Sequence, residues 1–118
     1  MKKKDWFENQ IENIGKSLAV ALFGKEVLKK TFDNLKESEE NTANPIDDIY
    51  KKATLDSLIN AKEITKAENY VFEFVNKNKT SGNLLLAILF YNKLLDSGLI
   101  SEEHARESLN KLRQLYNE

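Results

Sequence analysis

The pattern of apolar and polar positions along the chain predicts an all-α protein of five or six helices. Residues 84–91 form an unbroken apolar and aromatic run. At about 100° per residue, such a run faces all sides of a helix axis, so a helix here needs neighbours all around it. Thr80 precedes the run as a helix-start residue, and Gly98 follows as a helix-end glycine. We predict a central helix surrounded over its first half, with Leu89 among the enclosed residues.

Three further helices are predicted between residues 45 and 117 from narrower apolar stripes. Asn44–Pro45 has the form of a helix start, and the helix that follows ends near residue 61. The next helix spans about 64–78, and the last begins after Ser101. Together with the central helix, these segments predict a stack of antiparallel helical hairpins over 45–117. Residues 39–44 are polar and are predicted to be a linker.

The amino-terminal segment, residues 1–38, carries a heptad pattern that continues to Leu35. Gly24 interrupts it, so either one long helix passes through the glycine or two helices lie near 5–23 and 26–38. We favour the break. The narrow stripe suits another helix, and we predict a symmetric dimer through it unless the fold itself covers this surface. The candidate interface residues are Phe7, Ile11, Ile14, Leu18 and Ala21.

Composition places the whole chain, residues 1–118, in a single soluble domain. Hydrophobic residues make up 41% and charged residues 31%, and the net charge is -1. Basic and acidic residues are balanced in both halves, so the basic footprint of a nucleic-acid-binding protein is missing. The apolar run is far shorter than the roughly 20 residues that span a bilayer, and there is no cysteine. We expect a cytoplasmic protein that binds neither nucleic acid nor membrane.

Candidate chemistry is sparse. His104 and Glu107 share one face of the last predicted helix and could supply two metal ligands, but carboxylate-bundle metal sites need further glutamates from facing helices. We therefore predict a solvent-facing His104 and no catalytic, cofactor or metal-binding residues. Asp47 and Asp48 are explained by the dipole of the helix that they begin. Three glutamates in and just before the 64–78 helix are expected to be solvated; they are Glu63, Glu68 and Glu73.

Two stretches resemble the turn and second helix of a tetratricopeptide unit. One is Leu58-x5-Ile64-x2-Ala67-x3-Val71-x2-Phe74, and the other is Leu94-x4-Leu99-x5-Ala105-x3-Leu109. Their alanines lie about 38 residues apart, near the roughly 34-residue repeat of that family. The tryptophan, glycine and proline of the full consensus are missing. The resemblance implies a short tetratricopeptide-like stack.

Four short motifs resemble a family of small uncharacterised helical proteins of Gram-positive bacteria. They are Asp-Trp-x3-Gln-Ile-Glu at 5–12, Leu-Phe-Gly-Lys at 22–25, Lys-Ala-Glu-Asn at 66–69 and Phe-Tyr-Asn-Lys-Leu at 90–94. That family has no assigned activity, so the resemblance implies a helical fold and no chemistry. With no cysteine and no nucleophile motif in the sequence, we predict a non-catalytic protein-interaction or scaffold protein. The alternative is a helical protein that binds a small ligand or metal ion in a cavity near the central helix.

Overall fold

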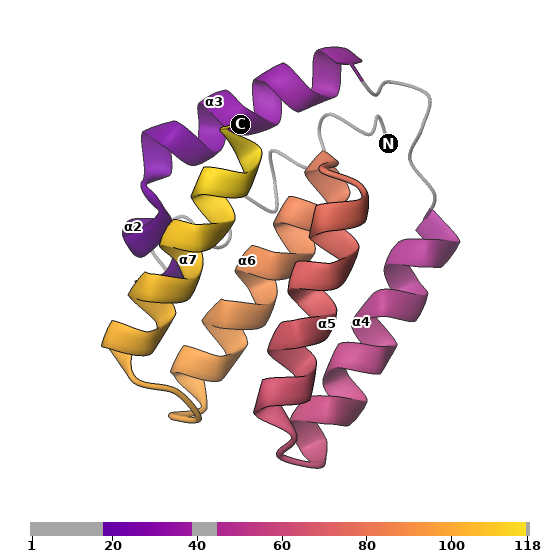
Figure 1. The fold of residues 1–118 in the computed structure, drawn as a ribbon, viewed down its shortest axis with the longest axis vertical. Helices are drawn as coiled ribbons and strands as arrows, with labels where there is room; N and C mark the ends of the chain where they lie inside the picture. Colours follow the sequence, from indigo (N-terminus) through magenta and orange to yellow (C-terminus); the bar gives the residue numbers. More distant parts are fainter. Residues whose placement is uncertain (1–17, 39–44, 118) are drawn as a thin grey trace.

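The computed structural model describes residues 18–38 and 45–117, and these residues form six α-helices and no strand. In Figure 1, α4, α5, α6 and α7 run side by side with alternating direction, and α3 crosses one end of them. The predicted all-α fold is confirmed. The helices are α2 (Leu18–Phe23), α3 (Lys25–Ser38), α4 (Pro45–Asn60), α5 (Ile64–Lys77), α6 (Ser81–Asp96) and α7 (Glu102–Tyr116).

Helix α6 lies at the centre of the fold. It packs against each of the other five described helices. Its apolar run is buried at every position except Leu89, and the polar residues Asn92, Lys93 and Asp96 come only in its second half. The central helix predicted from the sequence is therefore confirmed. Its buried residues contribute more to the one continuous core than those of any other described helix, and the inner faces of its neighbours supply the rest.

Leu89 is the exception, and the expectation that it is enclosed is wrong. The residue is only partly buried, because it faces a groove between α6 and α4 instead of the inner surface of a neighbouring helix. Truncation of a fully buried leucine typically costs about 2–5 kcal/mol of stability. Because Leu89 is only partly buried, we expect its truncation to alanine to cost less than this range.

The start and the end of α6 follow the signals in the sequence. The Thr80 hydroxyl accepts a hydrogen bond from the backbone N–H of Asn83 at 3.1 Å, which satisfies one unpaired donor of the first turn. At the other end, Gly98 adopts a φ of +67°, and the N–H of Leu99 donates back to the Leu94 carbonyl at 3.0 Å. This left-handed turn ends the helix in the manner usual for glycine.

A buried polar cluster ties three helices to the first turn of α6. Asn83, only 2% exposed, donates from Nδ2 to the Asn78 carbonyl after α5 at 2.7 Å. Its Oδ1 accepts a hydrogen bond from Nζ of Lys51 on α4 at 2.9 Å. The Tyr116 hydroxyl on α7 donates to the Thr80 carbonyl at 2.8 Å. Because buried polar groups are costly when unpaired, these bonds favour one placement of α4, α5 and α7 on α6.

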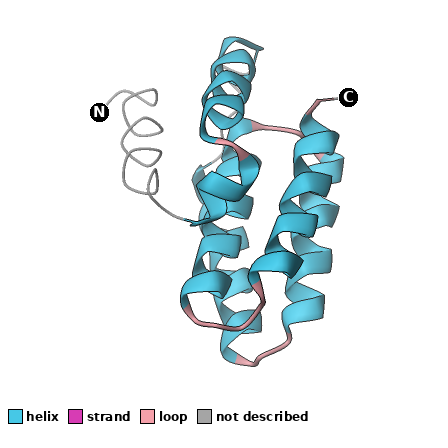
Figure 2. Cartoon of the chain, turned by 90° about the vertical axis from the view of Figure 1, so that its left-hand side faces the viewer, coloured by secondary structure: helices cyan, strands magenta, loops and turns pink. Residues whose placement is uncertain are grey.

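The break predicted at Gly24 is confirmed. This glycine has a φ of +104° and separates α2 from α3, although its N–H and carbonyl still bond to Val20 and Leu28 at 2.9 and 2.8 Å. The change of direction lets α2 pack on α6 and α7, whereas α3 lies across the end of the helices (Figures 1 and 2). Nη1 of Arg113 donates to the Phe23 carbonyl at 3.4 Å, where α2 ends.

We expect Gly24→Ala to lower the free energy of unfolding by about 1–3 kcal/mol. The added Cβ would meet Val27 at an ordinary 3.6 Å, so the penalty comes from the positive φ and not from a clash. Gly98→Ala is the matched control, because a Cβ there meets nothing within 4 Å and the φ of +67° is nearer the left-handed minimum. This substitution should lower the free energy of unfolding by about 1 kcal/mol. Urea denaturation measures both, and a Gly24→Ala protein as stable as wild type would contradict the bend.

Candidate functional site

The Glu68 side chain on α5 joins three helices. Its Oε1 accepts hydrogen bonds from the Tyr91 hydroxyl on α6 at 3.0 Å and from the Ser108 hydroxyl on α7 at 3.3 Å. The same oxygen lies 2.7 Å from Nε2 of His104, also on α7. Glu68 is only 15% exposed, so the expectation that it is solvated is wrong. Its carboxylate is held between helices because a buried phenol needs an acceptor there.

Tyr91 is fully buried, which explains the direction of its titration. Burial raises the pKa of the phenol above its ordinary value of 10.0; the Ser108 hydrogen bond lowers it, and the negative charge of Glu68 raises it further. Tyr91 therefore keeps its proton and donates it to Glu68. Among the described residues, no buried side-chain nitrogen or oxygen lacks a hydrogen-bond partner. A tyrosine within an apolar run was the signal in the sequence that an acceptor had to be nearby.

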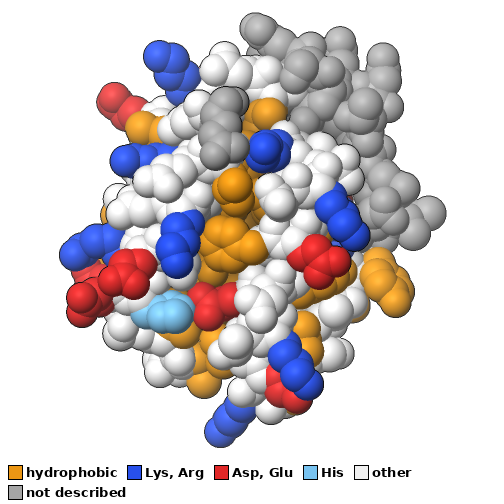
Figure 3. Space-filling model, in the orientation of Figure 1, with side chains coloured by type: hydrophobic (Ala, Val, Ile, Leu, Met, Phe, Trp, Pro, Cys, Tyr) orange, Lys and Arg blue, Asp and Glu red, His pale blue; other side chains and the backbone are white. Residues whose placement is uncertain are grey.

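His104 is exposed, as predicted, and forms the outer part of this cluster. The side chain is 47% exposed, and the histidine is visible beside acidic atoms on the face shown in Figure 3. The Ser108 hydroxyl donates to Glu68 and not to the imidazole, so the arrangement does not form a nucleophile–base pair. Across residues 18–38 and 45–117, no three potential metal-ligating side chains gather at one place. The geometry of the cluster is that of an inter-helix clamp.

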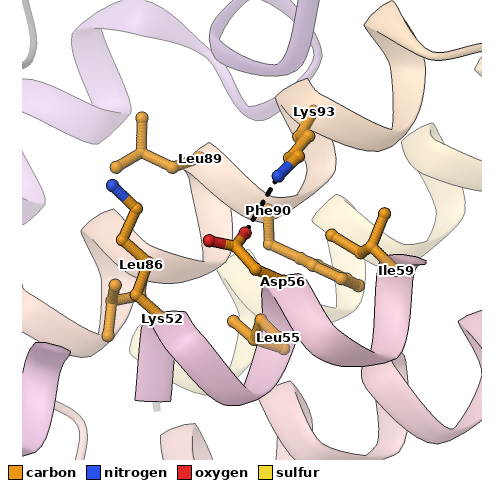
Figure 4. Close-up of a pocket in the computed structure, with 8 residues that line it drawn as sticks. All are labelled: Lys52, Leu55, Asp56, Ile59, Leu86, Leu89, Phe90 and Lys93. Atoms are coloured by element: carbon orange, nitrogen blue, oxygen red, sulfur yellow. Dashed lines mark hydrogen bonds and ion pairs between the residues drawn. The ribbon is translucent and has the colours of Figure 1, made fainter. Parts of the chain in front are cut away.

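A groove between α4 and α6 is the second feature of the surface. It encloses a pocket of about 340 Å³ whose floor is apolar and whose mouth carries two lysines and one aspartate (Figure 4). Nζ of Lys93 lies 2.9 Å from Oδ1 of Asp56 across this mouth. The residues that line it are Lys52, Leu55, Asp56, Ile59, Leu86, Leu89, Phe90 and Lys93.

The apolar surface continues along α4 beyond the groove. Ile49 is 69% exposed and lies two helical turns before Asp56 on the same side of the helix. Tyr50, beside it, is 72% exposed. In Figure 1, α4 stands at the edge of the row of helices, and it packs against α5 and α6. Large apolar side chains on such an edge are available to another molecule.

The predicted amino-terminal interface is described only in part. Phe7, Ile11 and Ile14 lie outside the described residues. Leu18 is 40% exposed and Ala21 is also exposed, and the two are three residues apart on α2, so they share a face. An exposed pair of this kind is compatible with an interface, and the dimer stays a prediction.

We expect Glu68→Ala to cost about 1–3 kcal/mol of stability, because it leaves the buried Tyr91 hydroxyl without its acceptor. Tyr91→Phe should cost about 1 kcal/mol, and the double variant should lose less than the sum of the two single losses, by at least about 0.5 kcal/mol. His104→Ala, at the exposed edge, should change stability by no more than about 0.5 kcal/mol. Additive losses in urea denaturation would show that the clamp contributes nothing as a unit.

The raised pKa of Tyr91 predicts a loss of stability at high pH. The unfolded phenol loses its proton above about pH 10, whereas the folded phenol keeps it, so its stabilising contribution is present below pH 10 and declines above. The stability advantage of wild type over Tyr91→Phe should therefore shrink between about pH 9 and pH 11. Urea denaturation of both proteins across this range measures the difference, and a constant difference would contradict the buried phenol.

None of the described helices is long and apolar enough to cross a membrane.

Comparisons with known proteins place the chain in a family. Comparison with curated proteins and with solved structures finds no match in either. A family described as a family of unknown function (DUF6483) matches residues 1–117, almost the full length of the chain. The chain therefore belongs to the DUF6483 family.

Proposed function

We propose that this protein is a non-catalytic interaction protein that binds an α-helix of a partner protein in the groove between α4 and α6. The observation that carries the proposal is this groove, with its apolar floor, charged mouth and continuation to the exposed Ile49. An amphipathic helix laid into an apolar groove is a recurring mode of protein recognition. The surface lies on an edge helix, where a further helix can pack without displacing any described element.

The dimensions of the groove suit a short helix. From Ile49 to Ile59 the surface extends along α4 for about 15 Å, at 1.5 Å per residue. Three turns of a partner helix match this length and place anchors at positions i, i+3 or i+4, and i+7. Residues of α4 and of α6 line the two sides of this groove, and the two helices run in the same direction.

The proposal includes a tetratricopeptide-like arrangement of two hairpins, α4–α5 and α6–α7. Supporting it, α6 packs against both helices of the preceding hairpin. Ala67 and Ala105, the small residues of the two matching stretches, are both fully buried. Stacked hairpins of this kind form extended binding surfaces. We place this function in the cytoplasm of a Gram-positive bacterium, in keeping with the sequence resemblance.

A second candidate function is the binding of a small ligand in the same groove. Its volume of about 340 Å³ falls within the roughly 300–1,000 Å³ of small-molecule sites. Native mass spectrometry of the purified protein separates the candidates, since a bound small molecule adds a defined mass to the folded chain. A spectrum with a stoichiometric small-molecule adduct would favour this second function over the first.

The partner-binding proposal predicts that Leu89→Asp weakens binding without unfolding the protein, because Leu89 is partly exposed on the groove floor. Proteins captured from the source cells by wild type are purified and titrated against wild type, Leu89→Asp and the control Lys77→Glu. Lys77 is exposed on α5, and its ion pair within the described part of the chain is with the exposed Glu73, four residues earlier. We expect at least tenfold weaker binding for Leu89→Asp alone. Equal binding by all three proteins would contradict the groove.

We also propose a symmetric dimer through the amino-terminal stripe that includes Leu18 and Ala21. Their exposure on α2 supports it. Wild type should sediment as a dimer at tens of micromolar, and Leu18→Asp should give a folded monomer, because a partly exposed leucine accepts a charge without loss of the core. A wild type that sediments as a monomer would contradict the dimer, and an unfolded Leu18→Asp protein would place the interface elsewhere.

A further inference from the structure

The charges at the mouth of the groove are unequally paired. Asp56 on α4 and Lys93 on α6 form an ion pair at 2.9 Å, with both side chains near half exposure. Lys52, one turn before Asp56, takes part in no ion pair or hydrogen bond within the described part of the chain. In Figure 4 its ammonium group lies on the other side of the mouth from the Asp56–Lys93 pair, above the floor near Leu89. Among the described residues at the mouth, cations therefore outnumber anions by one.

A helix that covers the floor must also cover part of Lys52. Removing an ammonium group from water without a partner is strongly unfavourable, whereas a carboxylate within reach converts the loss into a charge-assisted hydrogen bond. A lysine or arginine at the same place would repel Lys52. Asp56 does not compensate for Lys52, because its carboxylate already pairs with Lys93. The occupant that fits best is apolar toward the floor and acidic toward Lys52.

We infer that the partner helix carries an Asp or Glu that faces Lys52, flanking apolar anchors that sit on Leu86, Leu89 and Phe90. This inference rests on the proposed function, which it deepens by naming the charge of the partner. The floor residues supply the apolar contact, and Lys52 selects the sign of the charge on the partner helix. A neutral apolar helix binds more weakly, and a basic amphipathic helix is excluded.

The test begins with a displayed library of random peptides about 16 residues long, enough to span the groove as a helix. The library is selected for binding to the full-length protein. We expect the enriched peptides to place apolar residues at i, i+3 or i+4, and i+7, with an excess of Asp and Glu beside them. The strongest peptide is synthesised in its original form and with its acidic residue changed to Lys, and both are titrated at low salt.

Charge reversal in the protein then identifies the contact. The Lys52→Glu protein should bind the original peptide at least tenfold more weakly than wild type does. It should bind the lysine-bearing peptide more tightly than wild type does. The matched control, Lys77→Glu, should change the affinity by less than twofold. Lys52 is exposed, so both variants are expected to fold, and circular dichroism verifies it.

The outcomes separate the inference from the function on which it rests. If Leu89→Asp abolishes peptide binding but Lys52→Glu leaves it unchanged, the groove is the binding site, and the inference of an acidic partner residue is wrong. Enriched helices without an acidic excess lead to the same conclusion. If Leu89→Asp leaves peptide binding unchanged, the peptides bind elsewhere, and both proposals are wrong. Both proposals are also wrong if the selection enriches no helical pattern.

Discussion

The structure depends on one constraint, which is that α6 must be covered on nearly all of its sides. Its apolar run leaves no side that is stable in water, and each fully buried leucine or isoleucine contributes about 1.5–3 kcal/mol through removal from solvent. Five described helices cover α6 together. Helices α4, α5 and α7 lie alongside it, α2 packs against α6 and α7, and α3 lies across one end. The bend at Gly24 makes this cover possible, because it turns one apolar segment into two helices with different directions.

Apolar cover alone allows several packings, and two polar contacts reduce that choice. The Tyr91 hydroxyl is a polar group in the core and donates a hydrogen bond to Glu68, which also accepts one from Ser108 on α7. At the other end of the bundle, Asn83 pairs with Lys51 and with the end of α5. Each contact also reaches a helix that is not next in the chain, α7 through Ser108 and α4 through Lys51, so a shifted helix would leave a buried polar group unpaired. Within the apolar run of α6, the cover by described residues is incomplete beside Leu89, and the groove proposed as the binding site lies there.

Much of the architecture could be predicted from the sequence, because helix periodicity and helix ends are local properties. The helix boundaries, the central helix and the break at Gly24 all follow from spacing and from glycine. The turn after α4 shows the limit of such signals, since Lys62 adopts a φ of 59° where a glycine is usual. Its neighbour Glu63 donates its N–H to the Leu58 carbonyl at 2.9 Å, so the hydrogen bonding of a glycine turn is present without the glycine.

The candidate site could be predicted less well, because it depends on how helices lie beside one another. Glu68 has the spacing of a solvated residue on its own helix, and only the approach of α6 and α7 reveals its role. Leu89 lies within an unbroken apolar run, and its partial exposure follows from the sideways position of α4. A cavity near the central helix was an alternative from the sequence, but its lining could not be derived from periodicity.

Amide hydrogen exchange under native conditions tests the central role of α6 most directly. If α6 is the helix that all others cover, its amides from Leu84 to Leu94 exchange only when the whole protein unfolds. Their free energies of exchange should then be equal to one another and to the free energy of unfolding from urea denaturation, and higher than those of the edge helix α4. Amides of α6 that exchange through smaller openings, before those of α4, would contradict the central role of this helix.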